Sequence, residues 1–199
     1  MNQEIEIEFK NLVTKEEFEG LLKEFSISNH QFILQQNHYF DTTSFSLKDH
    51  KAALRIRYKN NSYTLTLKQT INKGILETHQ DLSENEAQSM LQGGLLIQGD
   101  IRTLIDDLNI DSKEIQYLGT LETNRAETNY LNGTLVFDHS HYLNKNDYEI
   151  EYEVTDYEKG LQNFNHLLQK HQIDIRETNN KIQRFFIEKQ KGMGVHREY

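Results

Sequence analysis

The sequence predicts an α+β protein in which roughly eight antiparallel β-strands form a barrel, or tunnel, with flanking helices. Three observations support this fold class: many segments alternate polar and apolar residues, turn signals typical of hairpins separate them, and the polar positions within each strand share one face. If the apolar faces point outward and are covered by helices, the polar faces point inward. Eight strands are enough to close such a barrel.

The first predicted strand carries charges at every second position. Glu4, Glu6, Glu8 and Lys10 therefore share one face, with neighbours about 6.6 Å apart. Like charges this close repel each other unless water screens them or a cation binds between them. The spacing favours a metal site, and a water-exposed sheet face is the simpler alternative.

Charge alternation recurs further along the chain. Glu149, Glu151 and Glu153 repeat the acidic pattern, whereas segments 54–58 and 64–68 carry bases instead. An exposed sheet face usually mixes both signs, but here the strands segregate by sign. This segregation predicts carboxylates gathered around cations and bases gathered around an anion.

Asparagine and glycine mark the turns between strands. Asn132-Gly133 predicts a type I′ turn that joins strands 118–130 and 134–140, because both residue types tolerate positive φ. Similar signals at 59–62, 72–74 and 144–147 predict further hairpins.

Five helices are expected beside the strands. Thr14 and Ser83 each stand three residues before a glutamate, Glu17 and Glu86, in the capping-box pattern that begins a helix. Apolar residues at helical spacing predict three more helices. These cover residues 101–108, 157–171 and 179–191.

Length and charge limit the classes of function. The 199 residues can form one domain with a substantial core, and we expect a single domain over 1–191 with a frayed tail at 192–199. The formal net charge of −9 argues against binding a nucleic acid polymer. We find no membrane-spanning run and no secretion signal, and therefore predict a soluble, cytoplasmic protein.

The absence of cysteine limits the possible metal chemistry. Without cysteine the chain has no disulfide, no thiolate nucleophile and no cysteine-ligated zinc. Any metal ion must bind oxygen or imidazole ligands. Carboxylate-rich strands favour a hard cation, Mg²⁺ or Mn²⁺.

The segment from Glu6 to Lys10 resembles the ExExK signature of the CYTH superfamily, the triphosphate tunnel metalloenzymes. This superfamily includes class IV adenylate cyclases, thiamine triphosphatases and inorganic triphosphatases. The chain is most similar to the small single-domain CYTH proteins of Gram-positive bacteria. Further matching segments follow in family order: 39–42, 54–57, 65–68, Glu77, Arg125, 137–138, 149–153, Lys181 and Arg184.

The resemblance implies a tunnel that binds a triphosphate with one or two divalent ions, and it implies roles for individual residues. The implied phosphate-binding residues are Lys10, Arg55, Arg57, Lys68, Arg125, Lys181 and Arg184. The implied metal ligands are Glu6, Glu8, Glu151 and Glu153. Further candidates for the metal site or the tunnel are Glu4, Glu77, Asp138, Glu149 and Tyr39, of which Tyr39 could instead belong to the core.

Two positions depart from the family pattern. Many family triphosphatases place a lysine two residues before the position of Arg125, where it can assist the attacking water, and this chain has Thr123. A basic residue is also common two positions before Glu77, where this chain has Ile75. No catalytic residue is assigned, and hydrolytic rate and substrate preference stay open.

The function that we expect is metal-dependent hydrolysis of an inorganic or organic triphosphate. One alternative is a class IV adenylate cyclase, which converts ATP to cyclic AMP and pyrophosphate. Others are a binding module for a nucleotide or polyphosphate with weak catalysis, and a barrel whose polar face binds no ligand. The expected partner is a small triphosphate, with neither a nucleic acid polymer nor a membrane, and the protein is expected to be a monomer or homodimer.

Overall fold

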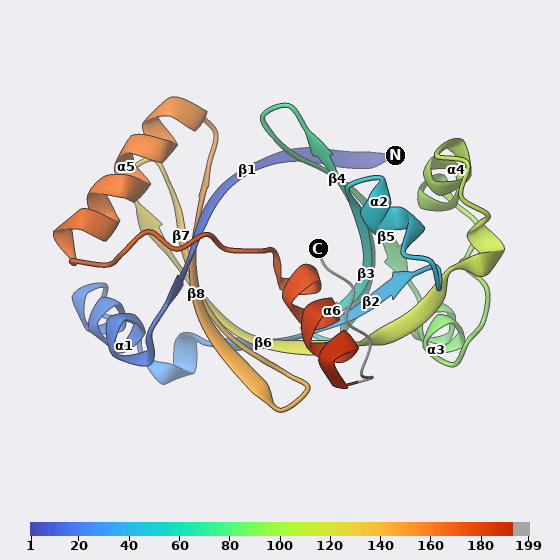
Figure 1. The fold of residues 1–199 in the computed structure, drawn as a ribbon, viewed down its shortest axis with the longest axis horizontal. Helices are drawn as coiled ribbons and strands as arrows, with labels where there is room; N and C mark the ends of the chain where they lie inside the picture. Colours follow the sequence, from blue (N-terminus) through green and yellow to red (C-terminus); the bar gives the residue numbers. More distant parts are fainter. Residues whose placement is uncertain (193–199) are drawn as a thin grey trace. The chain divides into compact units, whose positions relative to one another are not determined.

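The computed structural model describes residues 1–192 and contains eight antiparallel strands that close a barrel. Around the barrel the strands follow the order β1-β5-β4-β3-β2-β6-β7-β8 (Figure 1). The predicted eight-stranded antiparallel barrel with flanking helices is confirmed. The strands are β1 (Asn2–Val13), β2 (Ile33–Asp41), β3 (Ala52–Lys59), β4 (Ser62–Ile71), β5 (Gly74–Leu82), β6 (Gln116–Tyr130), β7 (Gly133–Tyr142) and β8 (Lys145–Val154).

All five predicted helices are present, and the three that were predicted with both ends begin and end within two residues of those positions. The α-helices are α1 (Lys15–Glu24), α2 (Ser46–Asp49), α3 (Glu84–Leu91), α4 (Asp100–Asp107), α5 (Tyr157–Lys170) and α6 (Lys181–Gly192). Among the described residues, no helix combines the length and the apolar character needed to cross a membrane.

The chain divides into two compact units. Unit 1 contains Met1–Ile7 and Leu34–Thr120, and unit 2 contains Glu8–Ile33 and Leu121–Tyr199. The single domain expected over 1–191 stays a prediction. Of the predicted frayed tail, Gly192 ends α6, and residues 193–199 lie outside the described part of the chain.

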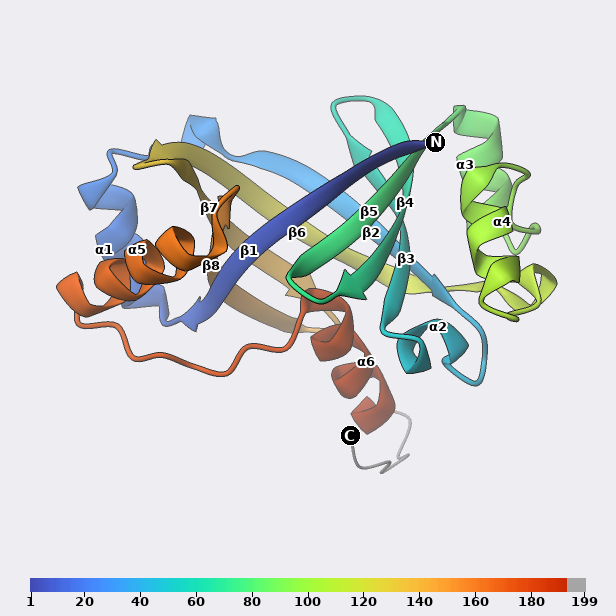
Figure 2. The same ribbon diagram turned by 90° about the horizontal axis from the view of Figure 1, so that it is seen from above.

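Unit 1 separates apolar and charged side chains by strand alternation. Leu54 and Ile56 of β3 are fully buried in an apolar cluster with Met90 of α3 and Ile101 of α4. Figure 2 shows α3 and α4 side by side. Because side chains alternate along a strand, Arg55 lies on the opposite face of β3. We call the strand face opposite the apolar cluster the inner face.

Unit 2 repeats this arrangement with other helices. Phe137 of β7 and Ile150 of β8 are buried in an apolar cluster with Phe18 of α1 and Phe164 of α5. Figure 1 shows α1 and α5 beside β7 and β8. The alternate residues of β7 and β8 therefore face the inner side, where the acidic pattern of the sequence lies.

Both predicted capping boxes are confirmed. Thr14 accepts a hydrogen bond from the Glu17 backbone N–H at 3.2 Å, and the Glu17 carboxylate accepts one from the Thr14 N–H at 2.6 Å. Ser83 and Glu86 exchange the same pair at the start of α3. These reciprocal bonds satisfy N–H groups that the first helical turn leaves without partners.

The sequence analysis missed the short helix α2. The buried Asp41 carboxylate accepts backbone hydrogen bonds from Thr42 at 2.7 Å, Leu47 at 2.9 Å and Lys48 at 3.2 Å. This side chain therefore holds the β2–β3 connection together. Four residues are too few to show a helical apolar period, so the sequence pattern contained no signal for α2.

The predicted hairpin between β6 and β7 is confirmed, but its predicted turn is wrong by one residue. Gly133 pairs with Tyr130, so Leu131 and Asn132 form the two-residue loop, and Leu131 has a φ of 48°. A Cβ atom on Gly133 would lie 2.5 Å from the carbonyl oxygen of Glu153. Glycine is needed here because β8 approaches closely, and not because the turn requires positive φ.

We expect Gly133→Ala to lower the free energy of unfolding by about 1–3 kcal/mol, because its methyl group would collide with the backbone of β8. The matched control is Gly20→Ala in α1, where a Cβ atom meets nothing within 4 Å. Gly20→Ala should raise the free energy of unfolding by about 0.5–1 kcal/mol, because alanine has a higher helix propensity than glycine. Urea denaturation of both variants checks this, and equal effects at the two positions would contradict it.

Candidate metal and phosphate site

Unit 1 places two predicted phosphate-binding arginines on its inner face. Arg55 pairs with Tyr39 across β2 and β3, and Arg57 pairs with Asn37. The Arg57 Nε donates a hydrogen bond to the Asn37 Oδ1 at 3.0 Å, which orients the guanidinium through a neutral partner. Tyr39 is buried on this same face, beside a predicted phosphate-binding residue.

A second set of inner-face residues in unit 1 is a buried carboxylate surrounded by bases. Lys68 pairs with Glu77 and lies 2.9 Å from Glu6, and Arg55 lies 3.9 Å from Glu77. Burial raises the pKa of Glu77, but the hydrogen bond with Glu6 and the charges of Lys68 and Arg55 outweigh burial and bring that pKa to about 2. Glu77 is therefore an anion at neutral pH.

Unit 1 also contains a histidine that the sequence analysis did not assign to the site. His79 Nε2 lies 3.1 Å from a Glu4 oxygen and 3.7 Å from a Glu77 oxygen, and its Nδ1 contacts the Thr66 hydroxyl at 3.0 Å. Ligand atoms of Glu4, Glu77 and His79 all lie within 4.8 Å of one another. The two-residue spacing of Glu77 and His79 was the available signal, because it places both on one strand face.

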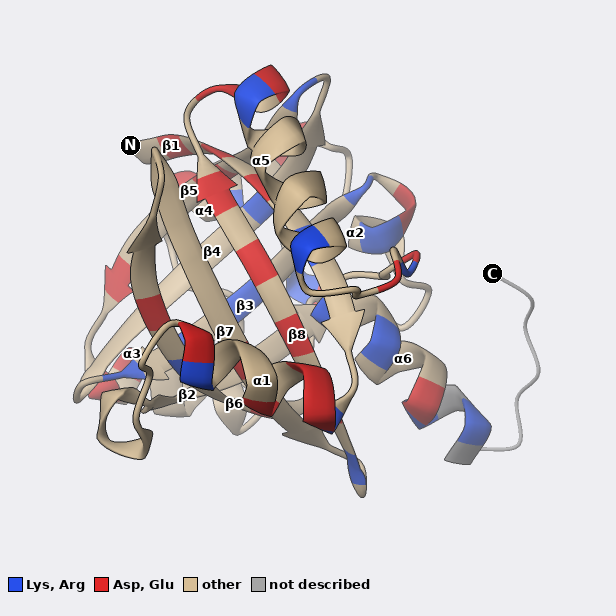
Figure 3. Ribbon diagram, turned by 90° about the vertical axis from the view of Figure 1, so that its left-hand side faces the viewer, with Lys and Arg blue, Asp and Glu red and all other residues tan. Residues whose placement is uncertain are grey.

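Three carboxylates gather on the inner face of unit 2. Asp138 of β7 lies directly across from Glu149 of β8, and Glu151 is the next inner-face residue along β8. Their ligand atoms lie within 4.8 Å of one another, and no side chain is more than 5% exposed. Figure 3 shows the acidic positions as separate bands along β8. We call Asp138, Glu149 and Glu151 the carboxylate cluster.

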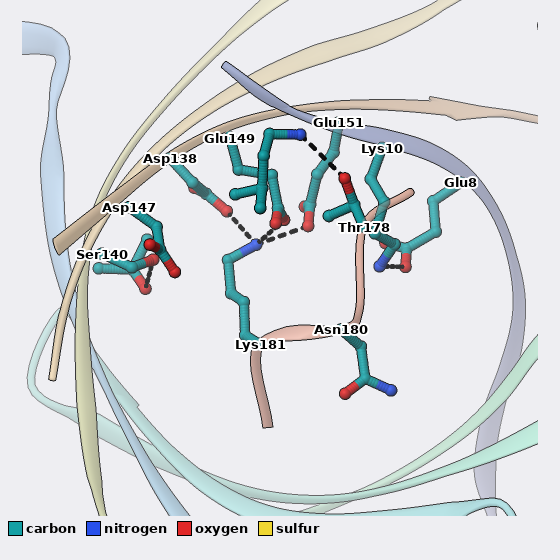
Figure 4. A network of polar contacts seen from close by, with 12 residues as sticks. Glu8, Lys10, Asp138, Ser140, Asp147, Glu149, Glu151, Thr178, Asn180 and Lys181 are labelled. Atoms are coloured by element: carbon teal, nitrogen blue, oxygen red, sulfur yellow. Dashed lines mark hydrogen bonds and ion pairs between the residues drawn. The ribbon is translucent and has the colours of Figure 1, made fainter. Parts of the chain in front are cut away.

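Two bases contact the carboxylate cluster directly. The Arg125 guanidinium donates two hydrogen bonds to Asp138, at 2.8 and 2.6 Å, and one to Glu151 at 2.7 Å. Lys181, the first residue of α6, contacts all three carboxylates, with Nζ 2.8 Å from Asp138 and 2.6 Å from Glu151 (Figure 4). These contacts neutralise part of the buried negative charge.

Other charged residues surround the carboxylate cluster. Arg184 of α6 lies 2.6 Å from Glu149 and 2.9 Å from Asp147. Of the predicted metal ligands, Glu8 pairs with Lys10 and Glu153 lies 3.6 Å from Arg125. Among the described residues, the three-carboxylate group contains the predicted ligand Glu151 together with the secondary candidates Asp138 and Glu149.

Acidic side chains outnumber basic ones in and around the carboxylate cluster. Four basic and six acidic side chains of unit 2 take part, which leaves a formal charge of −2 when all are ionised. The bases are Lys10, Arg125, Lys181 and Arg184, and the acids are Glu8, Asp138, Asp147, Glu149, Glu151 and Glu153. Within this set, the three carboxylates of the cluster are matched by three bases, Arg125, Lys181 and Arg184, and oxygen-only ligands suit Mg²⁺ or Mn²⁺.

Burial and the neighbouring charges shift the pKa values of two carboxylates of the cluster in opposite directions. Burial raises the pKa of Glu149 to about 7. The negative charge of Glu151 also raises this pKa, and the positive charges of Lys181 and Arg184 lower it without outweighing burial. Burial also acts on Glu151, but Lys181 and Arg125 outweigh it and hold the pKa of Glu151 well below its usual range. At neutral pH without an added cation, Glu149 is therefore partly protonated.

The raised pKa of Glu149 predicts a pH-dependent effect of Glu149→Gln. A carboxyl group whose pKa is higher in the folded state stabilises the fold below the unfolded pKa, and this contribution is lost as pH rises through about 7. Relative to the unmodified protein, the free energy of unfolding of the variant should therefore rise by about 1–3 kcal/mol between pH 5 and 8. Urea denaturation of both proteins in a chelating buffer measures this difference in the free energy of unfolding. A difference that stays constant or falls between pH 5 and 8 would contradict the prediction.

The two positions that depart from the family pattern are both uncharged. Thr123 is buried, and its hydroxyl lies 3.1 Å from the Ser140 hydroxyl, so the position two residues before Arg125 carries a neutral hydrogen-bonded pair. Ile75 pairs with Glu6 across β5 and β1. Neither residue supplies a proton-transfer group.

Comparisons with known proteins agree with this geometry. A family model described as the CYTH domain matches residues 4–186. The chain is 51% identical over 193 residues to YjbK of Bacillus subtilis, provisionally named a triphosphatase, and the match covers 97% of this chain and 100% of YjbK.

Two solved structures are similar to the chain. A Bacillus halodurans protein, provisionally named an adenylate cyclase, is 45% identical with a TM-score of 0.90, covering 94% of this chain and 100% of that protein. HpAC1 from Hippeastrum is 26% identical with a TM-score of 0.76, covering 92% and 96%. HpAC1 was provisionally named an adenylyl cyclase, and its description reports a dominant triphosphatase activity.

Proposed function

Because the chain belongs to the CYTH family, we propose that it is a metal-dependent enzyme that hydrolyses a triphosphate, with inorganic triphosphate as the substrate. The observation that carries this proposal is the carboxylate cluster of unit 2, in which three buried carboxylates offer ligand atoms within 4.8 Å of one another. The names of YjbK and HpAC1 support hydrolysis as the reaction.

Asp138, Glu149 and Glu151 would hold a magnesium or manganese ion, because three carboxylates supply the oxygen ligands that hard cations prefer. When bound, the ion would neutralise charge that develops on the transferring phosphoryl group. Mg²⁺ binds with several of its waters retained, so three protein ligands are a sufficient set.

Fixed bases would position the phosphate oxygens. In unit 2, Arg125 is held by a two-point contact with Asp138, which fixes the orientation of its guanidinium. A planar guanidinium matches the oxygens of a phosphate group in a way that the round ammonium of lysine cannot. Positioning and charge stabilisation provide most of the catalysis in phosphoryl transfer.

A second candidate reaction is cyclisation of ATP to cyclic AMP. One observation favours it: the Bacillus halodurans relative, at 45% identity, is provisionally named an adenylate cyclase. The two reactions differ in their products, so one assay separates them.

We expect the purified protein to release orthophosphate from inorganic triphosphate when Mg²⁺ or Mn²⁺ is present, and to stop when a chelator removes the ion. A colorimetric phosphate assay measures this. Parallel incubation with ATP, analysed by chromatography, tests for cyclic AMP. Failure to release phosphate with either ion would refute the proposed hydrolysis, and cyclic AMP as the main product would establish the second candidate.

Two arginine variants test whether Arg57 binds the substrate. Arg57→Ala should lower kcat/KM for triphosphate by about 10–100-fold, because it removes a charge-assisted contact to phosphate. Arg102→Ala is the matched control, since Arg102 lies on α4 and pairs with Asp106 at 3.9 Å. Equal activity of the two variants would contradict the assignment of Arg57.

A further inference from the structure

The carboxylate cluster already contains a cation, which the chain itself supplies. The Lys181 ammonium is the single charged group of the described residues that contacts all three carboxylates of the cluster. Its nitrogen lies 2.8 Å from Asp138 Oδ2 and 2.6 Å from Glu151 Oε1. Figure 4 shows these contacts meeting at the end of the Lys181 side chain.

The second oxygen of each carboxylate already contacts Arg125 or Arg184, so a divalent ion would need the oxygens that now contact Lys181. Mg²⁺ binds carboxylate oxygens at about 2.0–2.1 Å, and the three ligand groups lie within 4.8 Å of one another. An ion that used these oxygens would therefore lie close to the present position of the ammonium nitrogen. Two cations at that distance repel each other strongly in a buried site.

We propose that Lys181 is an internal substitute for the metal ion, and that a divalent cation enters the carboxylate cluster only as the Lys181 ammonium leaves it. This inference rests on the proposed function, because it takes the carboxylate cluster as the metal site. It adds a switch, because in the metal-free protein the Lys181 ammonium occupies the position of the metal ion. Metal binding then releases a positive charge that can contact a phosphate oxygen.

The chain around Lys181 is anchored so that the side chain can leave without loss of the fold. On the N-terminal side, Thr178 accepts a hydrogen bond from the Leu12 backbone N–H at 3.0 Å. On the C-terminal side, Arg184 contacts Asp147 and Glu149. Between these anchors, Lys181 begins α6 on a flexible four-carbon stem. Exchange of cations therefore needs only a local movement at the start of the helix.

Metal-binding measurements without triphosphate test the competition. Mn²⁺ affinity, measured by electron paramagnetic resonance, should rise by at least about tenfold in Lys181→Met, because the competing charge is removed. Lys181→Arg keeps the charge and should stay near the affinity of the unmodified protein. Lys170→Met, at an exposed pair with Glu24, is the matched control and should change nothing. Equal or weaker binding by Lys181→Met, or binding by Lys181→Arg that is as tight as in Lys181→Met, would overturn the proposal.

Hydrogen exchange of the unmodified protein gives a second test that does not depend on a variant folding. Adding Mn²⁺ should speed amide exchange at the start of α6, over residues 181–185, and leave α5 unchanged. Unchanged or slower exchange at the start of α6 would overturn the proposal. Neither experiment contains triphosphate, so failure of this inference and failure of the proposed hydrolysis give different results.

Discussion

Three carboxylates buried together are the main constraint on unit 2. Asp138, Glu149 and Glu151 would repel one another and lose their hydration, which makes the site unfavourable unless cations lie nearby. Arg125 and Lys181 meet that need from β6 and from the start of α6. The close approach of three oxygen ligands in a buried site is the physical reason for assigning a divalent cation to this cluster.

Strand alternation creates both the cluster and the core that supports it. Each inner-face carboxylate of β8 alternates with a buried apolar residue, Ile150 or Tyr152, which packs with α1 and α5. Moving the register by one residue would place carboxylates against the helices and apolar side chains on the inner face. The helices therefore stabilise the positions of the charged groups although they contribute none of the three carboxylates.

In unit 1, bases surround a single buried carboxylate instead of a cluster of three. Its buried carboxylate, Glu77, is held ionised by Lys68 and Arg55, whereas Arg57 has the neutral Asn37 as its hydrogen-bond partner. In unit 2, by contrast, Arg125 has three carboxylate partners, Asp138, Glu151 and Glu153.

The sequence predicted the features that depend on local patterns. Alternation predicted the strands, and the capping boxes predicted where α1 and α3 begin. It did not predict α2, which depends on contacts from Asp41, or the role of Gly133, which depends on the approach of β8. The contact of Lys181 with the carboxylates joins residues 30 or more positions apart, and no local period contains that information.

Anomalous diffraction from a crystal grown with Mn²⁺ and without triphosphate tests the central claim most directly, because it locates the ion and the lysine together. The account predicts an anomalous peak within bonding distance of Asp138, Glu149 and Glu151, with the Lys181 ammonium turned away from them. A peak elsewhere, or Lys181 still in contact with all three carboxylates beside a bound ion, would contradict it.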